Sequence, residues 1–219
     1  PADVTRYAIG SVLSGGGGNP YANNPREWAK MVREYLEAGQ QTRLSIPVIY
    51  GVDAVHGHNN VVGATIFPHN VGLGAARNPA LIRRIAEVTA IEVAVTGADW
   101  TFGPTVAVPR DDRWGRAYEG YGEDPEIVAS YAGEVTLGLQ GELRAGETLA
   151  PGRIAGSAKH YLSDGGTLNG LDQGDAQISE RELIDIHAAG YPPSINAGVL
   201  TVMATFSGWN GQKISGNAT

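Results

Sequence analysis

The chain has 219 residues, of which 42% are hydrophobic, so it is long and apolar enough to bury one sizeable core. Its formal net charge of −7 argues against nucleic acid as a partner, because proteins that bind nucleic acid present basic surface. The sequence has no cysteine, which excludes disulfides and thiolate catalysis, and no apolar run near the roughly 18 residues that a membrane span needs.

The predicted elements alternate between strands and helices from the first residues onward. Residues 7–13 form an apolar run that predicts a strand, and a cluster of glycines at 15–18 follows it. Asn24 and Pro25 predict the start of a helix, because Asn is a favoured N-cap and Pro fits the first helical position. Residues 46–52 are continuously apolar, as expected of a strand that is buried on both faces.

The same signals repeat along the rest of the chain. Further helix starts are predicted at Asn78-Pro79, at Asp124-Pro125 and at Ser179, whose partner Glu182 completes a capping box for a helix over 179–186. Three more strands are predicted between and after these helices: one within residues 98–108, one at 154–161 and one at 199–206. The result is five strands that alternate with four helices.

This alternation predicts an α/β fold in which helices cover a parallel sheet. Two closures remain open at this point, an eight-stranded (β/α)₈ barrel and a doubly wound open sheet. The chain lacks the Gly-x-Gly-x-x-Gly and Walker patterns, which counts against the nucleotide-binding form of the open sheet. The glycines at 15–18 could wrap a phosphate, but we favour a flexible loop.

Several polar residues stand where predicted strands end. Asp53 follows one strand, Lys159 and His160 close another, and Arg116 lies in the loop after a third. The strand ends of a parallel barrel share one face, and the active site lies on that face. Carboxylate, guanidinium, ammonium and imidazole groups together suit a neutral polyol such as a sugar. Four aromatic residues near the strand ends could add an apolar platform: Trp100, Trp114, Phe206 and Trp209.

Three other clusters have competing interpretations. The histidines at 56, 58 and 69 could bind a metal ion, but a catalytic metal needs a third ligand and a second shell, so we favour structural histidines with hydrogen bonds. The charged loop 111–124 is expected to form a buried ion network that fixes Arg116. Acidic residues follow His160 in a glycine-rich loop, at Asp164, Asp172 and Asp175. Their spacing does not match a Ca²⁺ loop, and we expect Asx-turns there.

Several longer motifs resemble those of glycoside hydrolase family 3, in the order that the family has them. They are residues 46–57 (IPVIYGVDAVHG), 63–70 (GATIFPHN), 113–119 (RWGRAYE), 159–161 (KHY), 164–167 (DGGT), 202–203 (VM) and 209–211 (WNG). They extend over nearly the whole chain. The resemblance is greatest to the branch that contains β-glucosidases and exo-1,3/1,4-β-glucanases.

The resemblance implies a (β/α)₈ TIM-type barrel and retaining hydrolysis of a terminal β-linked glucose. It also implies the residues that bind the glucose in the −1 subsite: Asp53, Arg116, Lys159, His160, Met203 and Phe206. Phe206 departs from the family pattern, in which a Tyr is common. The resemblance further suggests a cis peptide bond between Lys159 and His160. No cofactor and no metal ion are expected.

The same resemblance implies that residues 1–219 are a partial N-terminal barrel domain, without the later strands and the second α/β domain. The nucleophilic Asp and the acid/base Glu are expected beyond Thr219, so no catalytic residue is assigned within the chain. The expected partners are a β-glucan or β-glucoside substrate, a glucose product, and the remainder of the polypeptide or another chain that completes the barrel; no membrane partner is expected. No signal peptide is recognisable, and a periplasmic or secreted location is a family expectation alone.

Two other functions remain open. A carbohydrate-binding barrel fragment without catalysis would keep the sugar pocket and would show binding without turnover. A metal- or nucleotide-dependent barrel enzyme would hold a metal at His56 and His58 or a phosphate at residues 15–18, and the continuous sugar-site motifs count against it.

Overall fold

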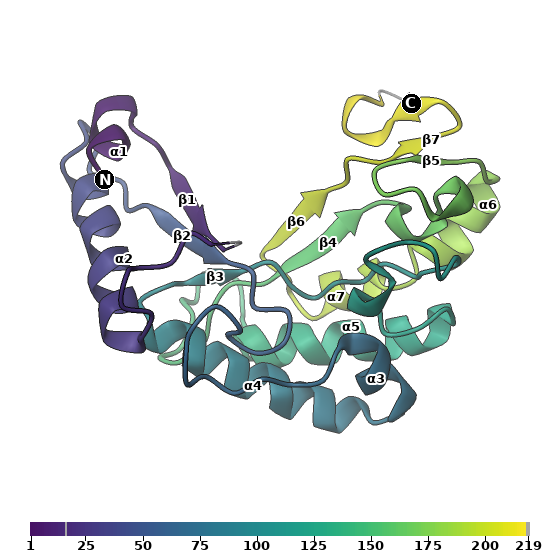
Figure 1. The fold of residues 1–219 in the computed structure, drawn as a ribbon, viewed down its shortest axis with the longest axis horizontal. Helices are drawn as coiled ribbons and strands as arrows, with labels where there is room; N and C mark the ends of the chain where they lie inside the picture. Colours follow the sequence, from purple (N-terminus) through teal and green to yellow (C-terminus); the bar gives the residue numbers. More distant parts are fainter. Residues whose placement is uncertain (16, 218–219) are drawn as a thin grey trace.

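The computed structural model describes residues 1–15 and 17–217, so Gly16 of the predicted glycine loop lies outside the described residues. Five parallel strands form the main sheet and follow one another in chain order: β1 (Ser11–Ser14), β2 (Ile49–Val52), β3 (Trp100–Thr101), β4 (Ser157–Tyr161) and β6 (Thr201–Ala204). Single parallel bridges, Trp100 with Ala155 and Thr105 with Lys159, join the β3 segment to the β4 segment. The sheet is curved and does not close, which confirms a TIM-type barrel that is incomplete in this chain (Figure 1).

Helices lie along the outside of this curved sheet (Figure 1). They are α1 (Ala2–Tyr7), α2 (Pro25–Gln40), α3 (Asn70–Ala75), α4 (Pro79–Val95), α5 (Pro125–Gln140), α6 (Glu180–Glu182), a π-helical turn (Leu183–His187) and α7 (Tyr191–Asn196). Short 3₁₀ turns occur at Ala117–Glu119, Asp164–Gly166, Leu168–Gly170 and Ile214–Gly216. A small second sheet is formed by β5 (Asp175–Ala176), β7 (Gly208–Trp209) and β8 (Gln212–Lys213). Among the described residues, no helix combines the length and the apolar character needed to cross a membrane.

The four predicted helix starts are confirmed by their caps. The Asn24 side chain accepts hydrogen bonds from the backbone N–H groups at the start of α2, and Asn78 and Asp124 do the same for α4 and α5. Ser179 and Glu182 form both hydrogen bonds of the predicted capping box. These caps satisfy N–H groups that have no partner within the helix, which is why a local sequence signal locates them well.

One strand prediction was wrong in part. Residues 7–13 do not form one strand, because Tyr7 ends helix α1 and β1 begins only at Ser11. Val4 of this helix is buried against Ala38 and Val48, and this contact outweighs the extended pattern of the following residues. The segment 98–108 does contain a strand, as predicted: β3 pairs with β2 at Trp100–Thr101, and residues 103–106 continue with backbone hydrogen bonds to β4.

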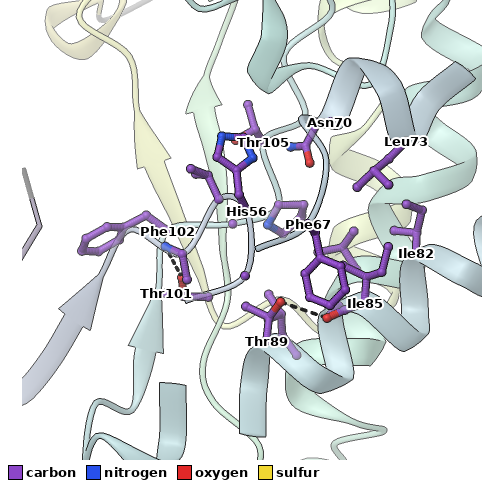
Figure 2. A pocket seen from close by; sticks show the side chains of 18 of the residues that line it. His56, Phe67, Asn70, Leu73, Ile82, Ile85, Thr89, Thr101, Phe102 and Thr105 are labelled. Atoms are coloured by element: carbon purple, nitrogen blue, oxygen red, sulfur yellow. Dashed lines mark hydrogen bonds between the residues drawn. The ribbon is translucent and has the colours of Figure 1, made fainter. Parts of the chain in front are cut away.

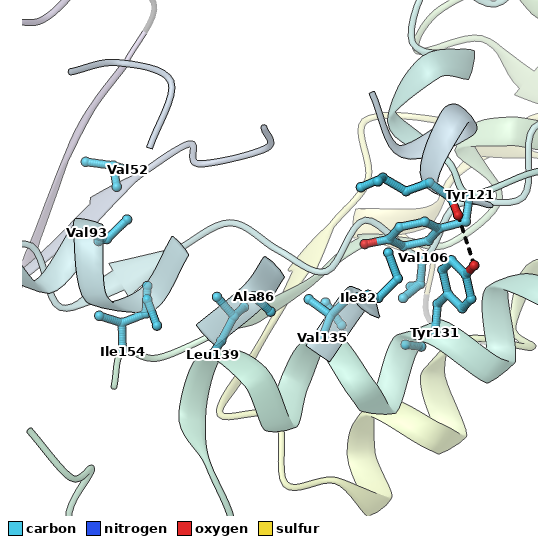
Figure 3. Close-up of a cluster of buried hydrophobic side chains, with 14 of the residues drawn as sticks. Val52, Ile82, Ala86, Val93, Val106, Tyr121, Tyr131, Val135, Leu139 and Ile154 are labelled. Atoms are coloured by element: carbon cyan, nitrogen blue, oxygen red, sulfur yellow. Dashed lines mark hydrogen bonds between the residues drawn. The ribbon is translucent and has the colours of Figure 1, made fainter. Parts of the chain in front are cut away.

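The hydrophobic core lies between the sheet and helices α4 and α5 (Figure 3). Ile82 and Ala86 of α4 face Val135 and Leu139 of α5 in this cluster. The two helices approach closely at Gly138, where an added Cβ would lie 2.5 Å from the Cβ atom of Ala86. Only glycine permits that separation, so the α4–α5 contact is fixed by shape as well as by apolar character.

Gln140, the last residue of α5, links this helix to the sheet. Its side-chain oxygen accepts hydrogen bonds from the N–H groups of Gly156 (3.0 Å) and Leu200 (3.1 Å), just before β4 and β6. Its side-chain amide donates to the carbonyl oxygen of Gly198 at 2.8 Å. The side chain is buried, so these three bonds satisfy polar groups that water does not reach.

Candidate sugar-binding site

The predicted substrate-binding residues meet at the carboxyl ends of the strands. Asp53 directly follows β2, Lys159 and His160 belong to β4, and Met203 belongs to β6. A pocket of about 290 Å³ is lined by Asp53, Arg116, Lys159, His160, Met203 and Phe206 together with Leu13, Phe102, Asp164, Asp172, Gln173 and Ala204. The structure therefore brings all six predicted residues together around one cavity.

Lys159 and Asp53 form an ion pair at the floor of this pocket. The Lys159 Nζ atom lies 2.9 Å from Asp53 Oδ1. The Lys159 side chain is 3% exposed whereas that of Asp53 is 48% exposed. A buried ammonium group requires a partner, and the half-exposed Asp53 carboxylate supplies it through one of its two oxygens. Lys159 thus orients Asp53 as an acceptor.

Arg116 is fixed by a buried carboxylate on the same loop. Its Nε and one terminal nitrogen donate to the two oxygens of Glu119, at 2.7 and 2.9 Å. Glu119 is buried, and its backbone carbonyl accepts a hydrogen bond from the Asn70 side chain at 2.8 Å. Burial opposes the charged guanidinium, but the Glu119 carboxylate outweighs burial and raises the pKa of Arg116. The ion network predicted for Arg116 is present.

The rest of the charged loop is more exposed. Arg113 pairs with Asp111: its Nε atom and one terminal nitrogen donate to the two oxygens of the Asp111 carboxylate. The Arg113 side chain is 68% exposed, so solvent screens this pair. Arg113 and Arg116, three residues apart, therefore have different surroundings, and only Arg116 lines the pocket.

His160 lies between Arg116 and Asp164. Its Nε2 atom is 3.0 Å from a terminal nitrogen of Arg116, and its Nδ1 atom is 2.7 Å from Asp164 Oδ2. Asp164 also accepts hydrogen bonds from the hydroxyl groups of Thr205 and Ser207. Burial raises the pKa of Asp164, but the contacts with His160 and the two hydroxyl groups outweigh it and lower this pKa below its ordinary value. The peptide bond between Lys159 and His160 is cis, as predicted, and so is the bond between Tyr161 and Leu162.

The Asx-turn interpretation of the three acidic loop residues was wrong. Asp164 binds hydroxyl groups of the segment after β6, and Asp172 accepts a hydrogen bond from the Trp114 indole at 3.0 Å. Asp175 accepts one from the backbone N–H of Gly211 at 2.9 Å. These partners are distant in the sequence and adjacent in space, so local spacing could not reveal them.

Pocket residues Asp164, Asp172 and Gln173 were missed as lining residues for the same reason. The motif at residues 164–167 directly after the Lys-His pair was the signal that could have found Asp164. Nothing in the local pattern marks Asp172 or Gln173.

Three of the four aromatic residues expected as a platform are not in the pocket. Their indole N–H groups bond to the scaffold: Trp100 to Thr201, Trp114 to Asp172 and Trp209 to the carbonyl oxygen of Ile178. Phe206 does line the pocket and is 72% exposed. The apolar contribution therefore comes from smaller side chains, namely Leu13, Phe102, Met203 and Phe206.

The histidines at 56, 58 and 69 have the hydrogen-bonded surroundings that we favoured. His56 Nε2 lies 2.9 Å from His69 Nδ1, and His58 Nε2 lies 3.1 Å from the Thr96 hydroxyl. Burial lowers the pKa of His58 to about 4. Within residues 1–15 and 17–217, no group of three or more His, Cys, Asp or Glu side chains is arranged to hold a metal ion.

A second pocket lies behind the sheet, between the segments that follow β2 and β3 and helices α4 and α5 (Figure 2). It has a volume of about 50 Å³, and most of its lining is apolar, including Phe67, Leu73, Ile82 and Ile85. Phe102 lines both this pocket and the pocket of about 290 Å³ described above. Its size and lining do not suit a polar ligand as large as a sugar ring.

The sequence and the structure were compared with known proteins. A lysosomal beta glucosidase of Dictyostelium discoideum is 33% identical over an alignment of 216 residues, which covers 94% of this chain and 26% of that protein. The solved exo-1,3/1,4-beta-glucanase of a Pseudoalteromonas species superposes with a TM-score of 0.93 at 49% identity, over 98% of this chain and 28% of that one. A beta-glucosidase of Listeria innocua, solved in complex with glucose, superposes with a TM-score of 0.77 at 29% identity, over 93% of this chain and 26% of that one.

The chain thus spans about a quarter of the length of the relatives that it matches. Residues 1–219 match the glycosyl hydrolase family 3 N-terminal domain over their whole length. The motifs, the open parallel barrel and these similarities lead to one conclusion. The chain belongs to glycoside hydrolase family 3 and corresponds to the N-terminal domain of that family.

Proposed function

We propose that this chain supplies the sugar-binding part of the active site of an enzyme that removes terminal β-linked glucose from β-glucans or β-glucosides. The observation that carries the proposal is the convergence of Asp53, Arg116, Lys159 and His160 around one pocket of about 290 Å³. That volume lies at the small end of the roughly 300–1,000 Å³ of ligand pockets, which suits one sugar ring rather than an oligosaccharide.

The polar groups of the pocket support a hydroxyl-rich, uncharged ligand. Asp53 carries an acceptor oxygen beyond the one that binds Lys159, and Arg116 carries donors beyond those that bind Glu119. Vicinal hydroxyl groups can donate to the carboxylate and accept from the guanidinium at once. The cations of the pocket are already paired with Asp53 and Glu119, so the site has little excess positive charge for a phosphate.

The proposed reaction is retaining double displacement, in which two carboxyl groups lie about 5–5.5 Å apart on either side of the glycosidic bond. Each pocket carboxylate of the described residues already has a partner: Asp53 binds Lys159, Asp164 binds His160 and two hydroxyl groups, and Asp172 binds Trp114. We therefore assign none of them as nucleophile. The nucleophilic Asp and the acid/base Glu stay a prediction for the polypeptide beyond Thr219, and a periplasmic or secreted location stays a prediction as well.

The pairing of every described pocket carboxylate favours one alternative function, a carbohydrate-binding barrel without catalysis. A pocket whose carboxylates are all engaged can bind a sugar and leave its glycosidic bond intact. The two functions differ in turnover and in the mass of the natural protein, because only the enzyme requires further catalytic carboxylates. Denaturing mass spectrometry of the natural protein should give a mass several-fold above 23.0 kDa if the enzyme proposal is right.

The central test replaces Arg116 by Lys in the natural protein and measures hydrolysis of laminaribiose. Lysine keeps the charge beside Glu119 but loses the planar fork that binds two oxygens at once. We expect kcat/KM to fall about 10-fold to 150-fold, since a hydrogen bond to a charged group contributes roughly 1.5–3 kcal/mol.

Arg113→Lys is the matched control, because this arginine lies on the same loop, pairs with Asp111 and does not line the pocket. Its kcat/KM should stay within about twofold of the natural protein. Glucose binding without any hydrolysis would support the binding-only alternative, and equal losses in the two variants would refute the proposed role of Arg116.

A further inference from the structure

Asp164 is buried beneath His160 and reaches three groups from two parts of the chain. Its Oδ2 atom lies 2.7 Å from His160 Nδ1, while its Oδ1 atom accepts from the hydroxyl groups of Thr205 and Ser207. Asp164 itself is 8% exposed. It therefore joins the end of β4 to the segment that follows β6, in the lining of the proposed sugar-binding pocket.

The partners of His160 determine which ring nitrogen carries the proton. The terminal nitrogen of Arg116, 3.0 Å from Nε2, can only donate a hydrogen bond. His160 Nε2 must therefore accept, with its lone pair directed at the guanidinium. The opposite nitrogen, Nδ1, is buried 2.7 Å from the carboxylate oxygen Asp164 Oδ2, so the negative charge favours a proton on Nδ1 even though the contact lacks ideal hydrogen-bond geometry. The surroundings of both ring nitrogens thus favour the tautomer with the proton on Nδ1.

The orientation of the Asp164 carboxylate is fixed independently of His160. The Thr205 hydroxyl oxygen accepts a hydrogen bond from the backbone N–H of Ser207 at 2.8 Å, which leaves its proton for Asp164 Oδ1. Ser207 adds a second hydroxyl at 3.0 Å on the same oxygen. Oδ2 is then directed at His160 with no freedom to exchange with Oδ1.

We propose that Asp164 is a positioning residue that holds His160 in its Nδ1–H tautomer, so that His160 Nε2 faces the pocket as an acceptor and selects a sugar hydroxyl that donates. This inference rests on the proposed sugar-binding function. In the sugar-free site, Arg116 donates a hydrogen bond to His160 Nε2. A bound sugar hydroxyl replaces Arg116 as the donor to Nε2, and the oxygen of that hydroxyl can accept a hydrogen bond from Arg116. A group that only accepts hydrogen bonds is rejected at this position.

The tautomer is tested in the sugar-free natural protein labelled with ¹⁵N-histidine, by long-range ¹H–¹⁵N correlation spectra that distinguish protonated from unprotonated ring nitrogens. His160 is assigned by its absence from the His160→Gln variant. We expect Nδ1 to be protonated and Nε2 to be unprotonated. An unprotonated Nδ1 would overturn the proposal.

Asp164→Asn should raise the share of the Nε2–H tautomer without changing the side-chain shape. The amide oxygen keeps the bonds from Thr205 and Ser207, so the amide NH₂ group faces His160 Nδ1, and Arg116 is then the one remaining group that favours a proton on Nδ1. Asp172→Asn is the matched control. It removes the same charge from the same pocket, but Asp172 accepts a hydrogen bond from Trp114 and has no contact with His160 in the hydrogen bonds described. The control should keep the tautomer, and an unchanged tautomer in Asp164→Asn would refute the role of Asp164.

Binding measurements test whether His160 Nε2 selects a sugar hydroxyl that donates. They compare glucose with its deoxy analogues and its deoxyfluoro analogues. Fluorine accepts weakly and cannot donate, so at one ring position the fluoro analogue should bind as poorly as the deoxy analogue, about tenfold or more below glucose. In Asp164→Asn the fluoro analogue should regain affinity relative to the deoxy analogue. If every fluoro analogue of the natural protein binds better than its deoxy partner, the acceptor role is wrong.

These measurements separate the failure of the inference from the failure of the proposed function. If no sugar binds while the spectra show the expected tautomers, the sugar-binding function and the selection of a hydroxyl both fail, and only the tautomer assignment remains. If sugars bind but the tautomer differs, the function remains and the inference fails.

Discussion

Individual buried side chains decide how this domain responds to acid. His58 is fully buried, its Nε2 atom lies beside the Thr96 hydroxyl, and the Trp28 ring contacts its edge. The Thr96 hydroxyl donates to the carbonyl oxygen of Val93, so it accepts from His58, which is neutral with its proton on Nε2. His187 is also buried, and burial together with Arg110 lowers its pKa to about 4.

The depressed pKa of His58 predicts a loss of stability at acidic pH. Between about pH 6.5 and pH 4 the unfolded chain binds a proton that the folded chain does not, so the free energy of unfolding falls as the pH is lowered through this range. A shift from 6.5 to about 4 corresponds to about 3 kcal/mol. Urea unfolding of the natural protein at pH 7 and pH 4.5 measures this loss.

His58→Gln is the variant that isolates the contribution of His58. Glutamine keeps an N–H group for Thr96 and cannot take up a proton in this range. The variant should lose less stability on acidification than the natural protein, and His187 should retain its own share. Identical pH dependence of the two proteins would count against the burial of a neutral His58.

At the scale of the elements, helix α5 is joined to the sheet through its last residue. Gln140 accepts from the N–H groups before β4 and β6 and donates to the carbonyl of Gly198. This uses both ends of the side-chain amide, so a group that only accepts cannot replace it. The amide therefore sets where two strands begin relative to α5.

Gln140→Glu should destabilise the natural protein by about 2–4 kcal/mol, because a buried carboxylate would face the Gly198 carbonyl without an N–H group between them. Helix α2 ends at Gln40, which is exposed, so Gln40→Glu is a matched control for added charge at the end of a helix. The control should change stability by less than about 1 kcal/mol. Equal effects in thermal unfolding would show that the Gln140 bonds do not matter.

The elements also show how far the sequence predicts this fold. The starts of α2, α4 and α5 were predicted because an N-cap and a following Pro act within one helical turn. The short helix α1 was missed, since six residues with one buried side chain give no periodic pattern. The strand predicted within residues 98–108 is β3, and the apolar residues after it pair with β4 instead of β2.

The candidate site was predictable only where strand order could be read from the chain. Asp53, Lys159 and His160 stand at strand ends, so their meeting follows from a parallel sheet. The link between Asp164 and Thr205 joins residues 41 positions apart, and no local pattern contains it. The Trp114 ring likewise does not line the pocket, and its N–H group donates to Asp172, a partner 58 positions away.

At the scale of the whole molecule, the open barrel has two outer strands. Within the described residues β1 pairs with β2 alone and β6 pairs with β4 alone. Apolar side chains on these outer strands are exposed, including Leu13 at 63% and Val202 at 47%. Unpaired strand edges with apolar side chains promote association between chains.

A polypeptide made of residues 1–219 alone should therefore fail to behave as a monomer and should show no glucosidase activity above buffer. Analytical ultracentrifugation and an assay with an aryl β-glucoside measure the two properties, with the natural protein as the control. A monomer that melts cooperatively would contradict the structural part of this prediction, and robust turnover would contradict the catalytic part.

The order of the strands has a consequence for synthesis on the ribosome. Because β1, β2, β3, β4 and β6 lie in the sheet in the order in which they are translated, each new strand meets a neighbour that already exists. The pocket residues are translated in the same order, with Asp53 first, then Arg116, then Lys159 with His160, and Met203 and Phe206 last. The four charged or ionisable groups that converge on the pocket are therefore synthesised before the two apolar side chains of β6 and the segment after it that complete its wall.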